Sequence, residues 1–303
     1  MQYAALKPCL FSISYAGTWG QASLPLNDFI ARAGKLGYQS VMLAGKRPHL
    51  SPLDATPELL GQVQAALRQA KVTCDIVAGY TNLASGSAAE VPLAEMQIAY
   101  VESLARIAGA LGASIVRIFT AYEMGDRDPL TLWRRAVAII REMCDRARDH
   151  RVTIAIQNHH DLALDTSSLL DLLTEIDRPN CKLAFDAWSP ALRGEDLYSA
   201  AKKAAPHTAT TTNADYIRVP RYRYRPELVN YERLAPDEVR AVAFGTGFID
   251  YAAFFRGLVE GGYAGIATYE ICSPIRGGGL LENLDASAAA YLSWLKDVGY
   301  ASA

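Results

Sequence analysis

The clearest indication of the fold lies in residues 152–188, which read VTIAIQNHHDLALDTSSLLDLLTEIDRPNCKLAFDAW. The apolar run Val152–Ile156 is short and β-rich, as expected of a buried strand. It is followed by a helical pattern at Thr166–Ile176 and by a second apolar run at Lys182–Phe185. Two buried strands joined by a helix form a βαβ unit, so this segment predicts a parallel sheet covered by helices.

The same alternation of strand and helix extends through the rest of the chain. The further expected strands are Cys9–Ser14, Ser40–Leu43, Val72–Ala78, Ser114–Phe119, Thr208–Tyr216 and Gly265–Tyr269. The further expected helices are Asn27–Leu36, Pro57–Ala70, Leu93–Leu111, Leu130–Asp149, Glu195–Ala205 and Leu284–Asp297. This order favours the α/β class and a single closed (β/α)8 TIM barrel over residues 1–303, with an open doubly wound sheet as the alternative. No GxGxxG motif follows the first strand, which disfavours a dinucleotide-binding sheet.

The composition limits the partners of this protein. The 303 residues include 30 Lys and Arg against 32 Asp and Glu, for a formal net charge of −2. This near balance disfavours binding to nucleic acid or to an anionic membrane. No apolar run approaches the ~20 residues of a membrane span, and the N-terminus lacks the pattern of a signal peptide. Five cysteines without a CxxC pair fit a reducing compartment, so we expect a cytoplasmic protein that acts on a small molecule.

One long segment, 218–247, interrupts the alternation after the seventh strand. It carries six arginines and three tyrosines. Long loops of compact domains are usually functional, and the aromatic content argues against disorder. We therefore expect a long ordered loop that either covers the barrel mouth or contacts another subunit, or whose Arg218 and Arg221 bind oxygen atoms of a substrate.

Two carboxylates directly follow expected strands, at the end of a barrel where active sites lie. Asp186 follows the sixth strand and Glu270 the eighth. Buried carboxylates are costly unless they are paired or bound to a cation, so this pair predicts a divalent metal or a basic partner. In the alternative structural interpretation, Asp186 caps the following segment and Glu270 pairs with Arg276.

The densest polar group is Gln157-Asn158-His159-His160, which directly follows the fifth strand. Alternate side chains of a strand share a face, so Gln157 and His159 are expected to point together. We expect one of the two histidines to be functional and favour His159. Trp188 offers a flat apolar face that suits a sugar ring. No GxSxG, phosphate-loop or HExxH motif occurs.

The strand endings IAIQNHH, LAFDAW and ATYEIC, with their spacing and the order of elements, resemble the xylose isomerase-like TIM barrels over essentially the whole chain. In this sugar phosphate isomerase/epimerase group, a Glu, an Asp, a His and a Glu after strands five to eight hold one divalent metal, often Mn, Mg, Co or Zn. The resemblance implies Asp186 and Glu270 as ligands. Gln157 stands where the first Glu is usual, and Thr212 or Asn213 where the His is usual. With Gln157 in place of a glutamate, the summed charge of the four expected ligand positions falls from −3 to −2.

The resemblance implies a divalent-metal-dependent isomerase or epimerase that acts on a sugar, keto sugar or polyol derivative. Gln157 has no ionisable group, so a one-base reaction is expected, with Glu270 or His159 taking the proton. Gln157 would then be a weak ligand or a substrate contact.

The residues expected to contact the substrate are Arg218, Arg221, Arg276, Trp188 and His160. The alternatives are a lyase or deglycosidase subunit acting on 3-keto glycosides, and a catalytically lapsed sugar-binding barrel. A homo-oligomer or a partner subunit is a further expectation. The DNA-repair branch of the family is disfavoured, because the chain has five histidines and a negative net charge.

Overall fold

The computed structural model describes residues 6–84, 92–122, 128–160 and 162–300. Eight parallel strands close into one barrel in the order β1-β10-β7-β6-β5-β4-β3-β2. The strands are β1 (Lys7–Phe11), β2 (Ser40–Ala44), β3 (Thr73–Ala78), β4 (Ile115–Phe119), β5 (Thr153–Gln157), β6 (Cys181–Phe185), β7 (Thr208–Asn213) and β10 (Ile266–Tyr269). The ring closes where β1 pairs with β10, with Cys9 opposite Thr268. This architecture confirms the predicted (β/α)8 TIM barrel.

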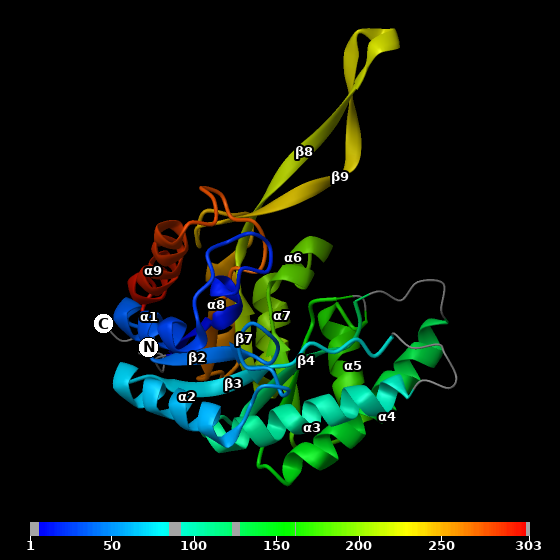
Figure 1. Cartoon of the computed structure of the whole chain (residues 1–303). Coiled ribbons are helices and arrows are strands. Elements are labelled where there is room, and N and C mark those ends of the chain that lie inside the picture. The colour runs from blue at the N-terminus through cyan, green and yellow to red at the C-terminus, as the bar shows by residue number, and fades with distance from the viewer. Residues whose placement is uncertain (1–5, 85–91, 123–127, 161, 301–303) are drawn as a thin grey trace.

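Helices connect the strands and surround the barrel (Figure 1). They are α1 (Leu26–Leu36), α2 (Pro57–Ala70), α3 (Leu93–Leu111), α4 (Pro129–Arg148), α5 (Thr166–Ile176), α6 (Trp188–Arg193), α7 (Leu197–Ala204), α8 (Tyr251–Glu260) and α9 (Leu281–Asp297). Side chains at several N-caps accept a backbone hydrogen bond from the first turn, among them Asp165 before α5 and Asp196 before α7. Such caps satisfy donors that the helix itself leaves unpaired, which fixes where each helix begins. No helix of the described residues is long and apolar enough to span a bilayer.

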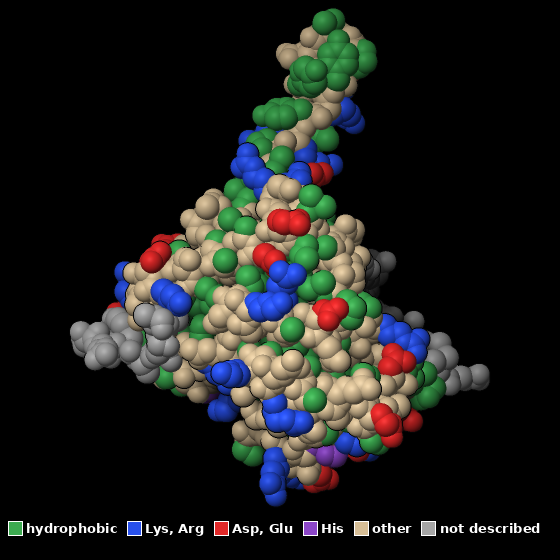
Figure 2. Space-filling view, turned by 60° about the vertical axis from the view of Figure 1, so that its left-hand side comes forward, with side chains coloured by type: hydrophobic (Ala, Val, Ile, Leu, Met, Phe, Trp, Pro, Cys, Tyr) green, Lys and Arg blue, Asp and Glu red, His purple; other side chains and the backbone are tan. Residues whose placement is uncertain are grey.

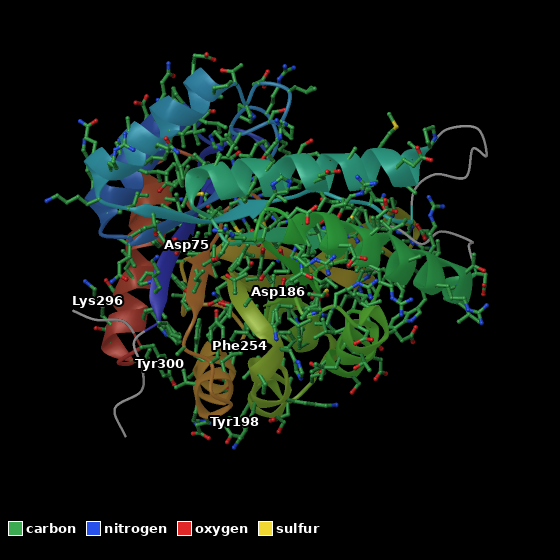
Figure 3. The ribbon with its side chains drawn as sticks, turned by 90° about the horizontal axis from the view of Figure 1, so that it is seen from below. Asp75, Asp186, Tyr198, Phe254, Lys296 and Tyr300 are labelled. Carbon is green, nitrogen blue, oxygen red and sulfur yellow. The ribbon has the colours of Figure 1, made fainter. Side chains whose placement is uncertain are left out.

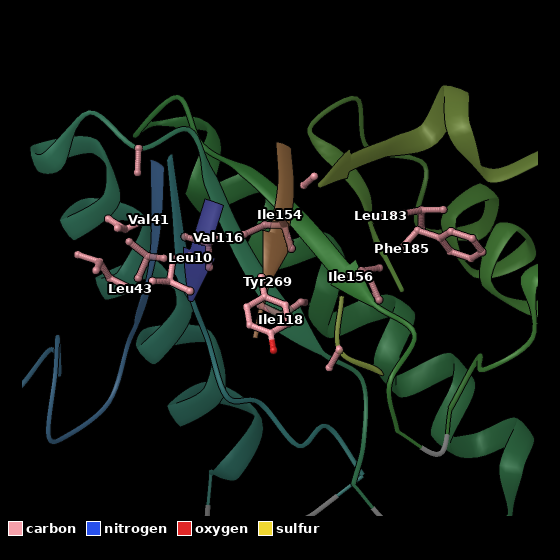
Figure 4. Packing of buried hydrophobic residues seen from close by; sticks show 14 of the residues in the cluster. Leu10, Val41, Leu43, Val116, Ile118, Ile154, Ile156, Leu183, Phe185 and Tyr269 are labelled. Atoms are coloured by element: carbon pink, nitrogen blue, oxygen red, sulfur yellow. The ribbon is translucent and has the colours of Figure 1, made fainter. Parts of the chain in front are cut away.

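The core has two parts because each strand buries both of its faces. The outward faces of the strands carry branched and aromatic residues that pack against the helices (Figure 4), including Leu43, Val116, Ile154 and Phe185. The inward faces form a separate small cluster of mostly short side chains, such as Ala155. Parallel barrels have this layered interior, in which the inner side chains of the strands fill the space.

The segment after β7 is a two-stranded antiparallel hairpin made of β8 (Asp215–Arg225) and β9 (Asn230–Val242). It rises away from the barrel as a long ribbon (Figure 1). Hydrophobic side chains gather at its tip, and basic ones lie between the tip and the barrel (Figure 2). The sequence led us to expect a long ordered loop here, either over the barrel mouth or against another subunit. The segment forms a β-ribbon that points away from the barrel, and a contact with another subunit stays a prediction.

Two smaller differences affect the elements next to the site. The first strand begins at Lys7 and ends at Phe11, and a 3-10 helix (Ser12–Tyr15) occupies the residues that we expected to extend it. The short helix α6 directly after β6 was not expected. Both segments lie just beyond the carboxyl ends of barrel strands, where polar groups compete with regular backbone pairing.

Candidate active site

A pocket of about 190 Å³ lies at the carboxyl ends of the barrel strands. Its polar lining consists of Thr18, Lys46, Arg117, His159, His160, Glu270 and Cys272, and its aromatic lining of Phe11, Tyr80, Phe119 and Tyr122. A larger hollow of about 550 Å³ lies at the opposite end of the barrel, between Lys182 and His207. We assign the site to the smaller pocket because buried charged groups gather there and active sites of this fold lie at that end.

Asp186 is the buried centre of a hydrogen-bond network beneath the pocket. Its Oδ1 accepts the backbone N–H groups of Trp188 and Ser189, at 3.0 and 3.4 Å, and so caps α6. Its Oδ2 accepts from Gln157 Nε2 and bonds to His159 Nδ1, both at 2.9 Å. Asp186 lies inside the molecule, whereas Tyr198 and Lys296 lie on the outer helices (Figure 3). Both oxygens of this carboxylate are therefore already occupied by groups of the protein.

His159 is the link between this network and the pocket. An ionised carboxylate only accepts hydrogen bonds, so its contact with Asp186 assigns the proton to Nδ1 and leaves Nε2 for the pocket. Burial lowers the pKa of His159, but the hydrogen bond and charge of Asp186, with the charge of Glu270, outweigh it and raise the pKa above 6.5. The imidazole of His159 stacks on Phe119, with ring centroids 5.9 Å apart. This ring is held in one orientation, and Asp186 favours its protonated form.

His160 lies beside His159 but in a different electrostatic environment. Burial, the charge of His159 and the charge of Arg117 lower the pKa of His160 to about 4. Its ring stacks on Tyr122 at 4.1 Å and meets Phe119 edge-on at 4.6 Å. His160 is therefore a neutral, packed wall of the pocket at neutral pH.

Glu270 faces the same pocket and is 6% exposed. Burial is the main reason that its pKa is raised above the usual value, while the charges of His159 and Arg117 oppose that shift. Among the described residues no ion pair holds its carboxylate, and Arg276, its expected partner, is exposed. A buried carboxylate that is not tied to a cation has the properties of a general base.

Arg117 on β4 was missed as a site residue. It lies on the inward face of its strand with Ile115 and Phe119, is 1% exposed, and lines the pocket. The available signal was a charged residue inside the apolar run Ser114–Phe119, since buried strands rarely carry an arginine without a reason. Lys46, after β2, lines the same pocket, and its ammonium group lies 3.8 Å from the centre of the Tyr80 ring.

Several predicted residues lie outside this pocket. Arg218 lies over the Phe248 ring at 4.7 Å, and Arg221 pairs with Glu238 along the hairpin. Arg276 is exposed, and its backbone N–H donates to Ala241. Trp188 packs on Tyr216, with ring centroids 4.2 Å apart.

Two further candidates need separate mention. The Asn213 amide donates to Thr211, to the Thr268 carbonyl and to Tyr291 on α9, so it faces the helix layer and not the barrel mouth. Glu123, another carboxylate that follows an expected strand, lies outside the described residues.

The donor set of this site does not fit a divalent metal. Asp186 is fully hydrogen-bonded, Gln157 donates to it, and Asn213 points elsewhere. Glu270 is a charged candidate ligand, but the oxygens near the other expected ligand positions are neutral: Gln157 Oε1, Thr212 Oγ1 and Asn213 Oδ1 are buried without a partner. No group of three His, Cys, Asp or Glu side chains within the described part of the chain could hold an ion. The positive charges of Arg117 and Lys46 in the same pocket also repel a divalent cation, which makes binding there still less favourable.

Comparison with known proteins supports the fold assignment. The sequence model of one family, described as "Xylose isomerase-like TIM barrel", matches residues 30–298. No curated protein sequence matches the chain.

Similar solved structures cover nearly the whole chain. A xylose isomerase domain protein from Alicyclobacillus acidocaldarius has a TM-score of 0.73 at 18% identity, covering 97% of this chain and 99% of its own. D-allulose 3-epimerase from Methylomonas sp. has a TM-score of 0.73 at 17% identity, covering 98% and 100%. A xylose isomerase-like TIM barrel protein from Mycobacterium smegmatis, in complex with magnesium, has a TM-score of 0.69 at 14% identity, covering 98% and 97%. At these identities the likeness establishes the fold.

Proposed function

The chain belongs to the xylose isomerase-like TIM barrel family, and from this premise we propose that it is an isomerase- or epimerase-type enzyme acting on a keto sugar or a related polyol derivative. The reaction class is proton transfer at a carbon next to a carbonyl group. One observation carries the proposal: Glu270 and His159 line a single pocket, and their surroundings give them opposite roles. The epimerase among the similar structures supports the same class of chemistry.

Glu270 is the proposed base. Its carboxylate removes the proton from the carbon next to the carbonyl, and its raised pKa makes it a stronger base than an exposed glutamate. Burial also keeps it from being solvated by water, which would weaken it as a proton acceptor. Returning the proton to the neighbouring carbon gives an isomer, which a single base on one face of the substrate can do. An epimer requires a second group that delivers a proton to the opposite face of the same carbon.

His159 is the proposed acid. Its Nε2–H donates to the carbonyl oxygen as negative charge develops there, and Asp186 holds the ring through Nδ1. Asp186 is thus a positioning residue that also favours the protonated imidazole. Gln157, which stands where the family usually has Glu, donates to Asp186 and has no proton to exchange, so one base does the work.

The divalent ion that the resemblance implied has no place in this scheme, because the donor set described above does not fit it. The polarising role at the carbonyl falls to a group of the chain itself, the Nε2–H of His159. A fixed cation or hydrogen-bond donor in a low-dielectric pocket stabilises an enolate by the same electrostatic principle as a metal.

The proposal is tested by proton exchange rather than by a guessed product. A panel of keto sugars, both neutral (D-fructose, D-tagatose and D-allulose) and acidic (2-keto-D-gluconate), is incubated with the protein in D₂O, and the C–H signal next to the carbonyl is followed by NMR. We expect loss of that signal with the wild type, and a rate lower by ~10²–10⁴-fold with Glu270→Gln. Exchange that is equally fast in the Glu270→Gln variant contradicts the role of Glu270.

The same experiment separates isomerisation from elimination. His159 could also protonate a leaving group β to the carbonyl, which is the lyase alternative. Elimination would release that group and produce a conjugated enone with its ultraviolet absorbance. No exchange and no release with a broad panel of keto sugars and 3-keto glycosides would favour the lapsed, sugar-binding alternative.

A further inference from the structure

Resting on the proposed function, we propose that Arg117 and Lys46 form a cation subsite that binds a carboxylate of the substrate, so that the enzyme acts on a small acidic keto sugar. Arg117 lies on β4 and Lys46 follows β2, whereas His159 follows β5 and Asp186 follows β6. The subsite shares the pocket with His159 but uses different side chains. A subsite for a carboxylate restricts the substrates to acidic sugars, a choice that the TIM-barrel fold alone leaves open.

Arg117 is a buried charge that forms no ion pair among the described residues, although the Glu270 carboxylate faces the same pocket. Its Nη1 donates to the Gly79 carbonyl at 2.9 Å, and its Nε has no hydrogen-bond partner in the structure. A guanidinium group carries five donors, so its Nε–H is free to bind a ligand. Its other neighbours are aromatic faces, with Phe119 at 4.1 Å and Tyr80 at 5.1 Å. Burying a charge in this way is costly unless an anion pairs with it.

Lys46 brings a second positive charge to the same place. Its ammonium group lies over the Tyr80 ring, which also faces the Arg117 guanidinium. Burial and the charge of Arg117 both lower the pKa of Lys46, which shows that the two cations act on each other. Among the residues that the structure describes, no carboxylate forms an ion pair with either one. Two like charges held together favour an anion between them.

The chemistry of the subsite favours a carboxylate. The fork of an arginine matches the two oxygens of a planar carboxylate, and a lysine beside it adds a point charge. The pocket of about 190 Å³ also holds Glu270 and His159, so a carboxylate at the cations leaves the adjoining carbons of a short chain facing the base and the acid. A keto group near the acid end of the substrate is then the group that reacts.

Binding of two matched probes tests the subsite. D-gluconate and D-sorbitol have the same carbon chain and differ by a carboxylate in place of a hydroxymethyl group. Isothermal titration at low salt should give gluconate at least ~10-fold tighter binding than sorbitol, as expected for a charged hydrogen bond. Lys46→Gln should remove most of this preference, and Arg117→Met should abolish it.

Lys203→Gln is the matched control, because it removes one positive charge from an exposed position in the last turn of α7. It should keep the wild-type preference, which separates local binding from the overall charge. Lys46 is only half-buried, so Lys46→Gln is expected to fold. If Arg117→Met does not fold, the loss of gluconate preference in Lys46→Gln alone tests the subsite.

Three results would overturn the subsite: no binding of gluconate at millimolar concentrations, equal affinity for both probes in the wild type, or an unchanged preference in Lys46→Gln. These binding results do not depend on turnover. A carboxylate preference without proton exchange would contradict the proposed activity alone, and exchange of neutral sugars without a carboxylate preference would contradict the subsite alone.

Discussion

At the scale of single residues, two adjacent histidines show how position sets chemistry. His159 contacts Asp186 and its pKa is raised, whereas His160 lies against Tyr122 and Phe119 and has a pKa of about 4. Side chains at successive positions after a strand point in different directions, so neighbours in sequence meet different partners. The sequence predicted that one of the two would be functional, but only the side-chain contacts distinguish the proposed proton donor, His159, from the packed wall formed by His160.

We expect NMR titration of the imidazole signals to separate these two residues. His159 should titrate above pH 6.5 and His160 near pH 4, with assignment by His159→Gln and His160→Gln. Asp186→Asn should lower the pKa of His159, because it removes the charge that outweighs burial. Since the folded pKa of His159 is raised, its protonation stabilises the fold below about pH 6.5, and this contribution is lost as pH rises through the folded pKa. An unchanged His159 titration in Asp186→Asn would contradict the assigned contact.

A second residue-scale prediction concerns the missing metal ligands. Gln157 and Thr212 each bury an unpaired oxygen on the inward face of their strands. We expect the double variant Gln157→Glu, Thr212→His to bind Mn²⁺ or Co²⁺, because it adds the charge and imidazole that such a site needs. The wild type should retain far less than one ion per chain after purification.

The wild type and the double variant are compared in two ways. Plasma mass spectrometry measures the metal content of each protein, and thermal unfolding measures the shift in melting temperature when each ion is added. Thr212→Val with Gln157 unchanged is the control for disturbing the interior of the barrel. A stoichiometric ion in the wild type would show that Asp186 releases its hydrogen bonds to a metal.

At the scale of elements, the sequence predicted the barrel well and the site only in part. The alternation of apolar runs and helices repeats wherever a strand is buried on both faces, so it was visible without a structure. The hairpin was expected as a loop because Arg221–Arg225 alternates arginine with tyrosine, and neither set forms an apolar face. Arg117 was missed because inward-facing and outward-facing positions of a doubly buried strand cannot be told apart by hydropathy.

The contact between α7 and α8 gives an element-scale prediction. A Cβ added at Gly257 would lie 2.3 Å from the Tyr198 backbone oxygen, so only glycine permits this approach of the two helices. Gly257→Ala should destabilise the protein by about 1–3 kcal/mol through forced separation of the helices. Gly61→Ala on α2 is the matched control: its Cβ meets nothing within 4 Å, and it should be neutral or stabilising by up to ~1 kcal/mol. Urea unfolding of both variants measures the difference, and equal stabilities would contradict the close packing.

At the scale of the whole molecule, the barrel and the hairpin are stabilised by different means. The barrel shares one continuous core between its strands and helices, whereas the outer part of the hairpin consists mainly of exposed residues. Its strands contact each other through backbone pairing and pairs such as Arg223–Glu232 and Tyr224–Tyr231. Exposed ion pairs contribute little, and a lone two-stranded hairpin is marginal in water. We therefore expect the hairpin to need the barrel for its stability, and the barrel to be stable without the outer part of the hairpin.

This asymmetry predicts the result of shortening the hairpin. Replacing residues 220–237 by Asn-Gly joins Val219 to Glu238, which face each other in the ribbon, through a turn that suits hairpins. We expect the melting temperature to change by no more than a few degrees, because no core residue is removed. Gluconate binding and the His159 titration should also be unchanged, since the residues that line the pocket all lie outside 220–237.

Hydrogen exchange gives the decisive comparison in the full-length chain. Amides of 221–234 should exchange far faster than those of the barrel strands if each chain stands alone. If their exchange is slow at high protein concentration and becomes fast on dilution, a second copy covers the ribbon. In that case Tyr222 and Tyr231, now more than half exposed, would become interface residues, and the shortened variant would elute as a smaller species.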